Sequence, residues 1–400
     1  MKTNLKLFSL LLAGASLYSC DQNSAENQSI KSEKISLEWE ILDSLDLEYL
    51  GQPVLADVNE TAGKVVFYEY TGQDLLITDL EGNIESKFSK SGDTPDAYGF
   101  MMSLPGFYNE NEISMHGMNG FFLYDLEGNM TKKVKHPEAP GAVAFMAQIG
   151  KTSERTTING KDYILTKSTR SRDTYPGEEI YYEKFRAIEV IDPETETVND
   201  IVPFEEGSIF LNGMGYIKSD YMPAFEADGN VLFSAMGGEP ILYKYTITEN
   251  SATLDTAVNL SIPEFQKIEG KELASFSKGS VAVTSVTPSI RNIHIVGDKL
   301  LVAYYSGMSD DQLKELEGYY NQGNQEEAEE RYYALEKKVK RGVLVFDKNS
   351  LELLGELAMP EEAKSINFVS GDEYLWMVRA APEDVEEDFL RVYKVGLNAD

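Results

Sequence analysis

Basic side chains are scarce in this chain, so its arginines are the most informative candidates for a binding site. Its 400 residues contain 67 acidic and 36 basic side chains, a formal net charge of −31. Arg and Tyr together suit anion or sugar recognition, because a guanidinium forms paired hydrogen bonds and a tyrosine offers both a ring face and a hydroxyl. The predicted binding residues are Arg170, Arg172, Tyr175, Arg291, Tyr305, Arg379 and Tyr98. The alternative is that these arginines pair with local carboxylates.

Motifs for catalysis or metal binding are missing from the sequence. There are three histidines, His116, His136 and His294; a His-based metal site is therefore not expected, and His116 and His294 are interpreted as structural. No nucleophile elbow, phosphate-binding loop or metalloprotease motif occurs. Carboxylate pairs such as Asp93 and Asp96 could support acid–base or glycosidic chemistry, but so acidic a composition produces such pairs by itself. The sequence predicts no catalytic residue, no metal and no cofactor.

Composition excludes several classes of protein. Apolar residues make up 42% of the chain and aromatic residues 11%, which is enough to build a core and argues against disorder. A single Cys rules out a disulfide scaffold. Nucleic-acid partners are not expected, because an acidic surface repels a phosphate backbone.

The first twenty residues predict export and lipidation. Lys2 and Lys6 precede an uncharged apolar run from Leu7 to Leu17. At about eleven residues this run is too short to span a bilayer and is typical of a signal peptide. The following LYSC sequence resembles the bacterial lipobox, in which the Cys is acylated, and its Cys20 is the only cysteine in the chain.

Three regions are expected along the chain. Residues 1–19 form a lipoprotein signal peptide, residues 20–33 the lipidated cysteine and a flexible polar tether, and residues 34–400 the folded domain. Acyl chains anchor a protein stably without spanning the membrane. The expected location is the outer membrane of a Gram-negative envelope, with the domain facing either the periplasm or the cell surface.

Two sequence units alternate along the remainder of the chain. The first is a turn rich in Asn, Asp and Gly followed by a strand, as expected for hairpins. Its strands lie at 65–70, 112–117, 162–166, 231–236, 299–305 and 373–378. The second is an apolar strand that commonly ends in Asp, at 75–83, 121–129, 187–195, 241–249, 343–351 and 390–398. The shortest spacings, about 46 residues, fit one four-stranded propeller blade.

The two ends of the chain complete the predicted fold, an all-β six-bladed propeller. The sixth repeat stops after its third strand. Before the first repeat, Ile35, Leu37, Trp39 and Ile41 alternate with polar residues, as in a half-buried strand. Adding this strand to the last blade closes the ring and removes an open edge. A seven-bladed ring and two separate β domains are the alternatives.

Lipobox, tether and six blades together resemble the six-bladed β-propeller lipoproteins of Bacteroidota, in the TolB-like propeller group. Residues 91–99, SGDTPDAYG, are similar to an inter-blade turn of that group, with Asp and Thr replacing some glycines. Many of these proteins have no known function. The resemblance therefore implies an architecture and a lipid anchor, and no established reaction.

Three long connections interrupt the repeat, at residues 169–184, 308–341 and 380–388. Each joins the second strand of a blade to the third, so all three emerge on one face. Loops on a rigid scaffold commonly carry binding groups, and this elaborated face is the predicted site.

The connection in blade five is predicted to be a helical hairpin that superficially resembles a tetratricopeptide unit. Ser309 is placed to cap a first helix, and Gly323 breaks it from the second. Two i,i+4 pairs, Glu327–Arg331 and Glu336–Lys340, are expected on the second helix. We expect the hairpin to pack over the ring as a lid or as a ledge for a partner.

The predicted function is a membrane-anchored module that binds a protein or glycan partner on the elaborated face. The alternative is a propeller enzyme, a hydrolase or lyase on glycans or peptides, acting at the channel mouth. Carboxylates, His116 or His294 clustered there would favour the enzyme. A purely structural envelope role is the third possibility.

Overall fold

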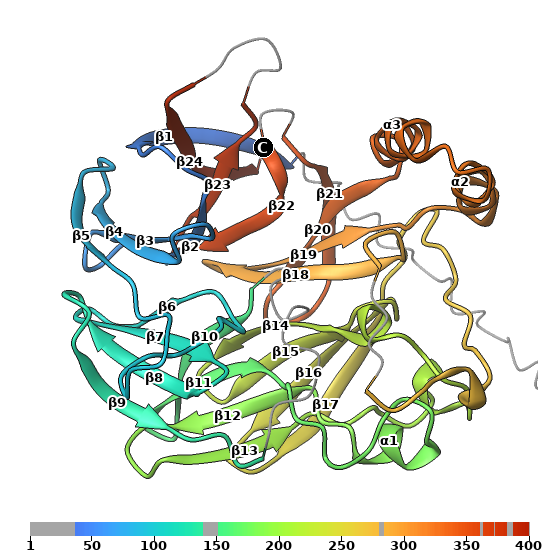
Figure 1. Ribbon diagram of the computed structural model, residues 1–400, viewed down its shortest axis with the longest axis horizontal. Coiled ribbons are helices and arrows are strands. Elements are labelled where there is room, and N and C mark those ends of the chain that lie inside the picture. Colours follow the sequence, from blue (N-terminus) through green and yellow to red (C-terminus); the bar gives the residue numbers. More distant parts are fainter. Residues whose placement is uncertain are drawn as a thin grey trace, which may run out of the picture. The chain divides into compact units, whose positions relative to one another are not determined.

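A computed structural model describes residues 37–138, 151–279, 284–360, 363–371, 373–381 and 387–399. Within these ranges, 24 strands form six antiparallel sheets of four strands each, arranged as blades around a ring (Figure 1). The six-bladed propeller is confirmed, and the seven-bladed and two-domain alternatives are wrong. The predicted signal peptide, Cys20 and the tether lie outside the described residues.

Blades one to three follow the order of the chain. Blade one contains β2 (Pro53–Asn59), β3 (Lys64–Glu69), β4 (Asp74–Asp79) and β5 (Ile84–Phe88). Blade two contains β6 (Gly106–Asn109), β7 (Glu112–Gly117), β8 (Gly120–Asp125) and β9 (Met130–Val134). Blade three contains β10 (Ser153–Ile158), β11 (Lys161–Lys167), β12 (Ile188–Asp192) and β13 (Thr197–Ile201).

Blades four and five keep this order, and blade six joins the two ends of the chain. Blade four contains β14 (Pro223–Asp228), β15 (Val231–Met236), β16 (Ile241–Ile247) and β17 (Ala252–Asn259). Blade five contains β18 (Ser289–Val296), β19 (Lys299–Tyr305), β20 (Arg341–Asp347) and β21 (Leu353–Ala358). Blade six contains β22 (Ala363–Ser370), β23 (Leu375–Arg379), β24 (Phe389–Ala399) and β1 (Leu37–Glu48).

The N-terminal strand closes the ring as predicted. β1 pairs antiparallel with β24, from Leu37 opposite Ala399 to Glu48 opposite Phe389. Arg391 on β24 reaches across this pair and donates two hydrogen bonds to the Asp46 carboxylate, at 2.7 and 2.6 Å. The last blade thus gains its outer strand from the other end of the folded domain.

The hydrophobic core is divided among the spaces between blades. The described residues form six clusters of buried apolar side chains, and each cluster joins one blade to the next. The innermost strands β2, β6, β10, β14, β18 and β22 contact one another in turn, and β22 contacts β2 again. Each blade therefore buries both faces of its sheet, while the inner strands enclose a central channel.

The insertion in blade five is a helical hairpin, α2 (Asp310–Asn321) and α3 (Gln325–Glu336). Ser309 caps α2: its hydroxyl accepts the Gln312 N–H, and its own N–H donates to the Gln312 side chain. Leu316 and Leu335 pack into the cluster between blades five and six. The hairpin is therefore fixed to the ring by its own apolar stripe.

The predicted i,i+4 pairs on the second helix are wrong. Arg331 pairs with Glu315 of α2, with 2.6 Å between Nε and Oε1. Glu336 pairs with Arg341 at the start of β20, with 2.7 Å between Oε1 and Nη2. Packing of α3 against α2 and the ring brings these partners closer than those along its own surface.

Candidate functional site

The elaborated face lies at the end of the ring where the innermost strands begin, which we call the upper face. The connection from β11 to β12 carries the short helix α1 (Glu179–Lys184), and the connection from β19 to β20 carries α2 and α3. Both join a second strand to a third. Because strand direction alternates within a blade, both emerge at the same end of the channel, as predicted for these two. Of the third predicted connection, 380–388, residues 382–386 lie outside the described residues.

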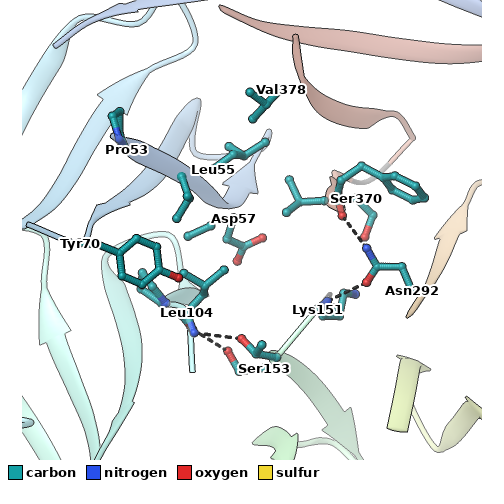
Figure 2. Close-up of a pocket in the computed structure, with 16 residues that line it drawn as sticks. Pro53, Leu55, Asp57, Tyr70, Leu104, Lys151, Ser153, Asn292, Ser370 and Val378 are labelled. Atoms are coloured by element: carbon teal, nitrogen blue, oxygen red, sulfur yellow. Dashed lines mark hydrogen bonds between the residues drawn. The ribbon is translucent and has the colours of Figure 1, made fainter. Parts of the chain in front are cut away.

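A cavity of about 330 Å³ lies inside the central channel. Five blades contribute to its wall (Figure 2). Leu55 and Leu104 give it an apolar side, while Asp57, Lys151 and Asn292 converge on it with polar groups. Below it a wider hollow of about 740 Å³ continues toward the other end of the channel and shares Asp57 and Lys151 with it.

The floor of the cavity is a charged cluster built on Lys151. Its ammonium contacts the carboxylate of Glu226 on β14 and lies 3.6 Å from Glu154 Oε1 on β10. Burial raises the pKa of both carboxyls. Burial disfavours the Lys151 ammonium as well, but Glu154 and Glu226 outweigh it and raise the pKa of Lys151. One lysine thus remains charged inside the protein because acidic groups surround it.

Asp57 is the carboxyl of this cluster that faces the cavity. It accepts the Phe107 N–H at 2.7 Å and the Val58 N–H at 2.9 Å. Burial raises the pKa of Asp57 to about 6, against the opposing effect of these two hydrogen bonds. A carboxyl with this pKa exchanges its proton close to neutral pH, a property common at functional sites.

Strand irregularities place two of the cavity's polar groups. The β2–β3 register shifts between Leu55 and Asp57, and the β18–β19 register shifts between Ile290 and Asn292. Each shift is a local bulge, which breaks the alternation of side chains and re-aims the residue that follows. In both strands a polar residue directly follows the shift and lines the cavity.

Asn292 and His294 of β18 support the cluster. Asn292 Oδ1 accepts the Lys151 N–H at 2.7 Å, which fixes the start of the third blade. His294 Nδ1 lies 2.9 Å from Ser370 Oγ and 3.7 Å from Glu226 Oε2. Burial lowers the pKa of His294 well below its ordinary value, so this ring is neutral.

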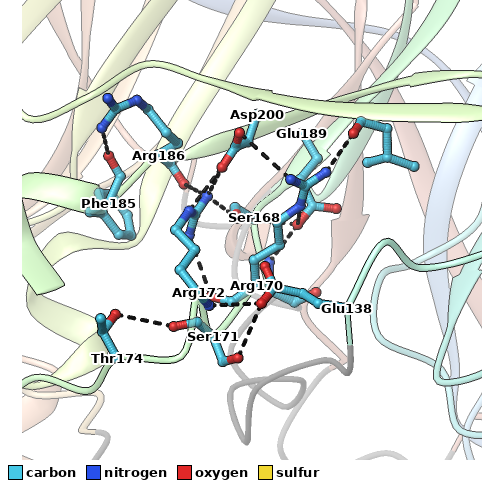
Figure 3. Close-up of polar contacts among 12 residues, drawn as sticks. Glu138, Ser168, Arg170, Ser171, Arg172, Thr174, Phe185, Arg186, Glu189 and Asp200 are labelled. Atoms are coloured by element: carbon cyan, nitrogen blue, oxygen red, sulfur yellow. Dashed lines mark hydrogen bonds and ion pairs between the residues drawn. The ribbon is translucent and has the colours of Figure 1, made fainter.

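The arginines predicted in the blade-three insertion form a paired network (Figure 3). Arg172 Nε donates to Asp200 Oδ2 at 2.8 Å. Arg170 donates to the Val198 carbonyl at 2.6 Å and lies 3.8 Å from the Glu189 carboxylate. Arg170 and Arg172 therefore have local carboxylate partners, which was the alternative to ligand binding in the sequence analysis.

The other predicted binding residues lie in separate places. The Arg291 guanidinium stacks 4.1 Å from the centre of the Tyr305 ring. Arg379 contacts the Glu387 carboxylate, Tyr175 is half-buried in the blade-three insertion, and Tyr98 is fully buried between blades one and two. Arg170 is thus brought beside Arg172, and Arg291 beside Tyr305. None of the seven is among the described residues lining the 330 Å³ cavity, and their part in binding stays a prediction.

Sequence reasoning missed the channel residues Asp57, Lys151, Glu154 and Glu226. A usable signal was present: Asp57 and Glu226 each lie between two apolar residues of a first strand, in PVLADVN and PAFEAD. A charged residue inside such a strand has to face the channel, because the blade faces are packed. Among the described residues, no three His, Cys, Asp or Glu side chains are arranged to hold a metal ion.

Two solved structures from Bacteroides share this fold. A member of the DUF4221 family from Bacteroides vulgatus has a TM-score of 0.62 at 12% identity, covering 92% of this chain and 100% of that chain. A candidate exported protein from Bacteroides fragilis has a TM-score of 0.51 at 12% identity, covering 91% and 95%. No family model and no curated protein matches the sequence. The resemblance to Bacteroidota propellers of unknown function is confirmed, as a resemblance of fold.

None of the helices within the described ranges is long and apolar enough to cross a membrane.

Proposed function

We propose that this protein is a lipid-anchored envelope module that binds a small polyhydroxylated ligand, such as the terminal sugar of a glycan, in the upper part of the central channel. The observation that carries the proposal is the 330 Å³ cavity, in which Asp57 faces an apolar wall. This volume lies at the lower end of the range for small-molecule sites, which are mostly apolar with a few convergent polar groups.

The chemistry of the floor favours a ligand without net charge. An anion would approach Asp57, Glu154 and Glu226, and a cation would approach the Lys151 ammonium. Sugar hydroxyls avoid both conflicts, because they donate to a carboxylate while the C–H face of the ring packs on apolar side chains.

Filling the cavity tests this proposal. Ala56 lies at the β2 bulge and lines the cavity. Ala56→Phe should weaken sugar binding by at least about tenfold, since the ring occupies the ligand's place. Glu110→Gln, in the lower hollow, is the matched control and should bind like the wild type. A glycan array followed by calorimetry gives the measurement, and equal binding by folded Ala56→Phe and wild type would refute the channel site.

The anchor is proposed from the lipobox and is tested separately. Cys20→Ala should abolish incorporation of labelled palmitate and move the protein from the membrane to the soluble fraction. An unchanged membrane fraction for this variant would contradict lipid anchoring while leaving the channel proposal intact.

A second candidate function is an enzyme that works on glycans or peptides in the same cavity. The specific observation in its favour is Asp57, whose raised pKa of about 6 lets it give or take a proton near neutral pH. In that case Asp57→Asn should abolish turnover of a glycan or peptide even at concentrations at which the folded variant still binds it. Product formation by this variant at the wild-type rate would exclude the role.

A further inference from the structure

A third hollow, of about 200 Å³, opens at the upper face among blades three, four and five. Lys167 lines it from the end of β11, Met222 and Pro223 from the start of blade four, and Ser289 and Arg291 from the start of β18. It shares no described lining residue with the cavity in the channel. We call it the Lys167 pocket.

Its charges are unusual for this protein. Acidic residues outnumber basic ones by 67 to 36 in the chain, yet the described lining of the Lys167 pocket holds two basic side chains and no carboxylate. Lys167 is buried and Arg291 is half-buried. The Arg291 guanidinium is held in place by its hydrogen bonds to Ser289 Oγ at 3.1 Å and to the Ser285 carbonyl at 3.0 Å, and by the Tyr305 ring.

The hydroxyl groups of the pocket add donors. Ser219 Oγ accepts the Thr284 N–H at 3.2 Å, Thr284 Oγ1 accepts the Val286 N–H at 3.3 Å, and Ser289 Oγ accepts from Arg291. A hydroxyl that accepts one hydrogen bond still has its own hydrogen to donate. Three hydroxyls with a hydrogen left to donate and two basic side chains together form a surface of donors.

We infer that the Lys167 pocket is a second binding site, which takes a small molecule bearing an oxyanion, either a carboxylate or a phosphate group. Arg291 and the hydroxyls would hold its oxygens by charge-assisted hydrogen bonds, and Lys167 would supply a second positive charge. Met222 and Pro223 leave an apolar wall for a short carbon skeleton. Burial lowers the pKa of Lys167 to about 7, so a bound anion would also restore the charge on this amine.

The test is calorimetric titration of the full chain with two probes, succinate and inorganic phosphate, at low ionic strength. We expect saturable binding of at least one probe, and the stronger one identifies the class. Lys167→Met and Arg291→Met should each weaken it by about tenfold or more. Thr287→Val is a milder change in the same lining and should weaken probe binding by about threefold. This variant provides the test if Lys167→Met or Arg291→Met does not fold.

Lys218→Met is the matched control. Burial lowers the pKa of Lys218 to about 7 as well, but its ammonium lies over the Phe185 and Tyr221 rings and it is not among the described residues lining the pocket. This variant should bind the probe like the wild type. No saturable binding of either probe up to about 10 mM, or equal losses in Lys218→Met and Lys167→Met, would overturn the inference.

Discussion

The floor of the central channel and the Lys167 pocket each contain one buried lysine, and the two differ in what surrounds it. Lys151 contacts Glu226 and lies near Glu154, and these carboxylates raise its pKa against the effect of burial. No carboxylate is among the described residues lining the pocket of Lys167, where burial lowers the pKa to about 7. Burial disfavours the charged ammonium at both sites, so the neighbouring groups decide whether each lysine is charged.

The charges of the channel cluster compensate one another, whereas the Lys167 pocket has basic side chains without a carboxylate in its described lining. In the channel, the Lys151 ammonium and the carboxylates of Glu154 and Glu226 stabilise one another, so they do not need a charged ligand as a partner. We therefore propose a neutral ligand for the channel and an anion for the Lys167 pocket.

The largest effect should come from removing Lys151. Lys151→Met leaves Glu226 and Glu154 buried without their cation, and the free energy of unfolding should fall by about 3–5 kcal/mol. Urea denaturation followed by circular dichroism measures this loss. The double variant Lys151→Met/Glu226→Gln should recover part of the loss, because it also removes one of the uncompensated charges. A single variant as stable as the wild type would show that the cluster is not coupled.

Removing Lys167 should have a smaller effect whose size depends on pH. The folded-state pKa lies below the ordinary value, so between about pH 7 and 10 the unfolded chain binds the proton more strongly and wild-type stability rises with pH. Lys167→Met lacks this dependence. The free energy of unfolding of Lys167→Met, relative to that of the wild type, should therefore fall by on the order of 3 kcal/mol between about pH 7 and pH 9.5. Denaturation at several pH values measures this difference. A difference that does not change with pH would mean that Lys167 has an ordinary pKa.

Replacing Asp57 should change stability least, and its effect should depend on pH in the opposite direction to that of Lys167. Its folded-state pKa is raised, so wild-type stability falls as pH rises through the range from about 4 to 6. The free energy of unfolding of Asp57→Asn, relative to that of the wild type, should rise by about 2 kcal/mol between about pH 4.5 and pH 7.5. Asp79→Asn is a control, since hydrogen bonds led by that of Asn83 lower the pKa of Asp79 and its titration lies below this range. Parallel stability curves for Asp57→Asn and the wild type would contradict the raised pKa.

The fold was predictable because its signals are local and repeated. Each hairpin turn is followed by a strand within a few residues, and β1 had to find a partner because its alternating residues Leu37 and Trp39 need one buried face. The helical hairpin was also predictable, from the Ser309 cap and the Gly323 break. Its ion pairs were not, because the partners of Arg331 and Glu336 come from α2 and β20.

The candidate sites were much less predictable. Arg170 and Arg172 stand out in the sequence as rare cations, but other strands of the same blade supply Glu189 and Asp200 as their partners. Asp57, Glu154 and Glu226 are three of many acidic residues, although Asp57 and Glu226 each lie between apolar residues of a first strand. The sequence does not show that these three carboxyl groups meet around Lys151.

By itself the sequence determined the number of blades, the strand that closes the ring and the face that carries the insertions. Hydrophobic alternation and turn chemistry act over a few residues, so they can be recognised without knowing where distant segments lie. Only the tertiary structure decided that Lys151 meets Glu226, 75 residues away, and that Lys167 shares a pocket with Arg291. Charge and protonation depend on three-dimensional neighbours and on burial, and the closed ring supplies both.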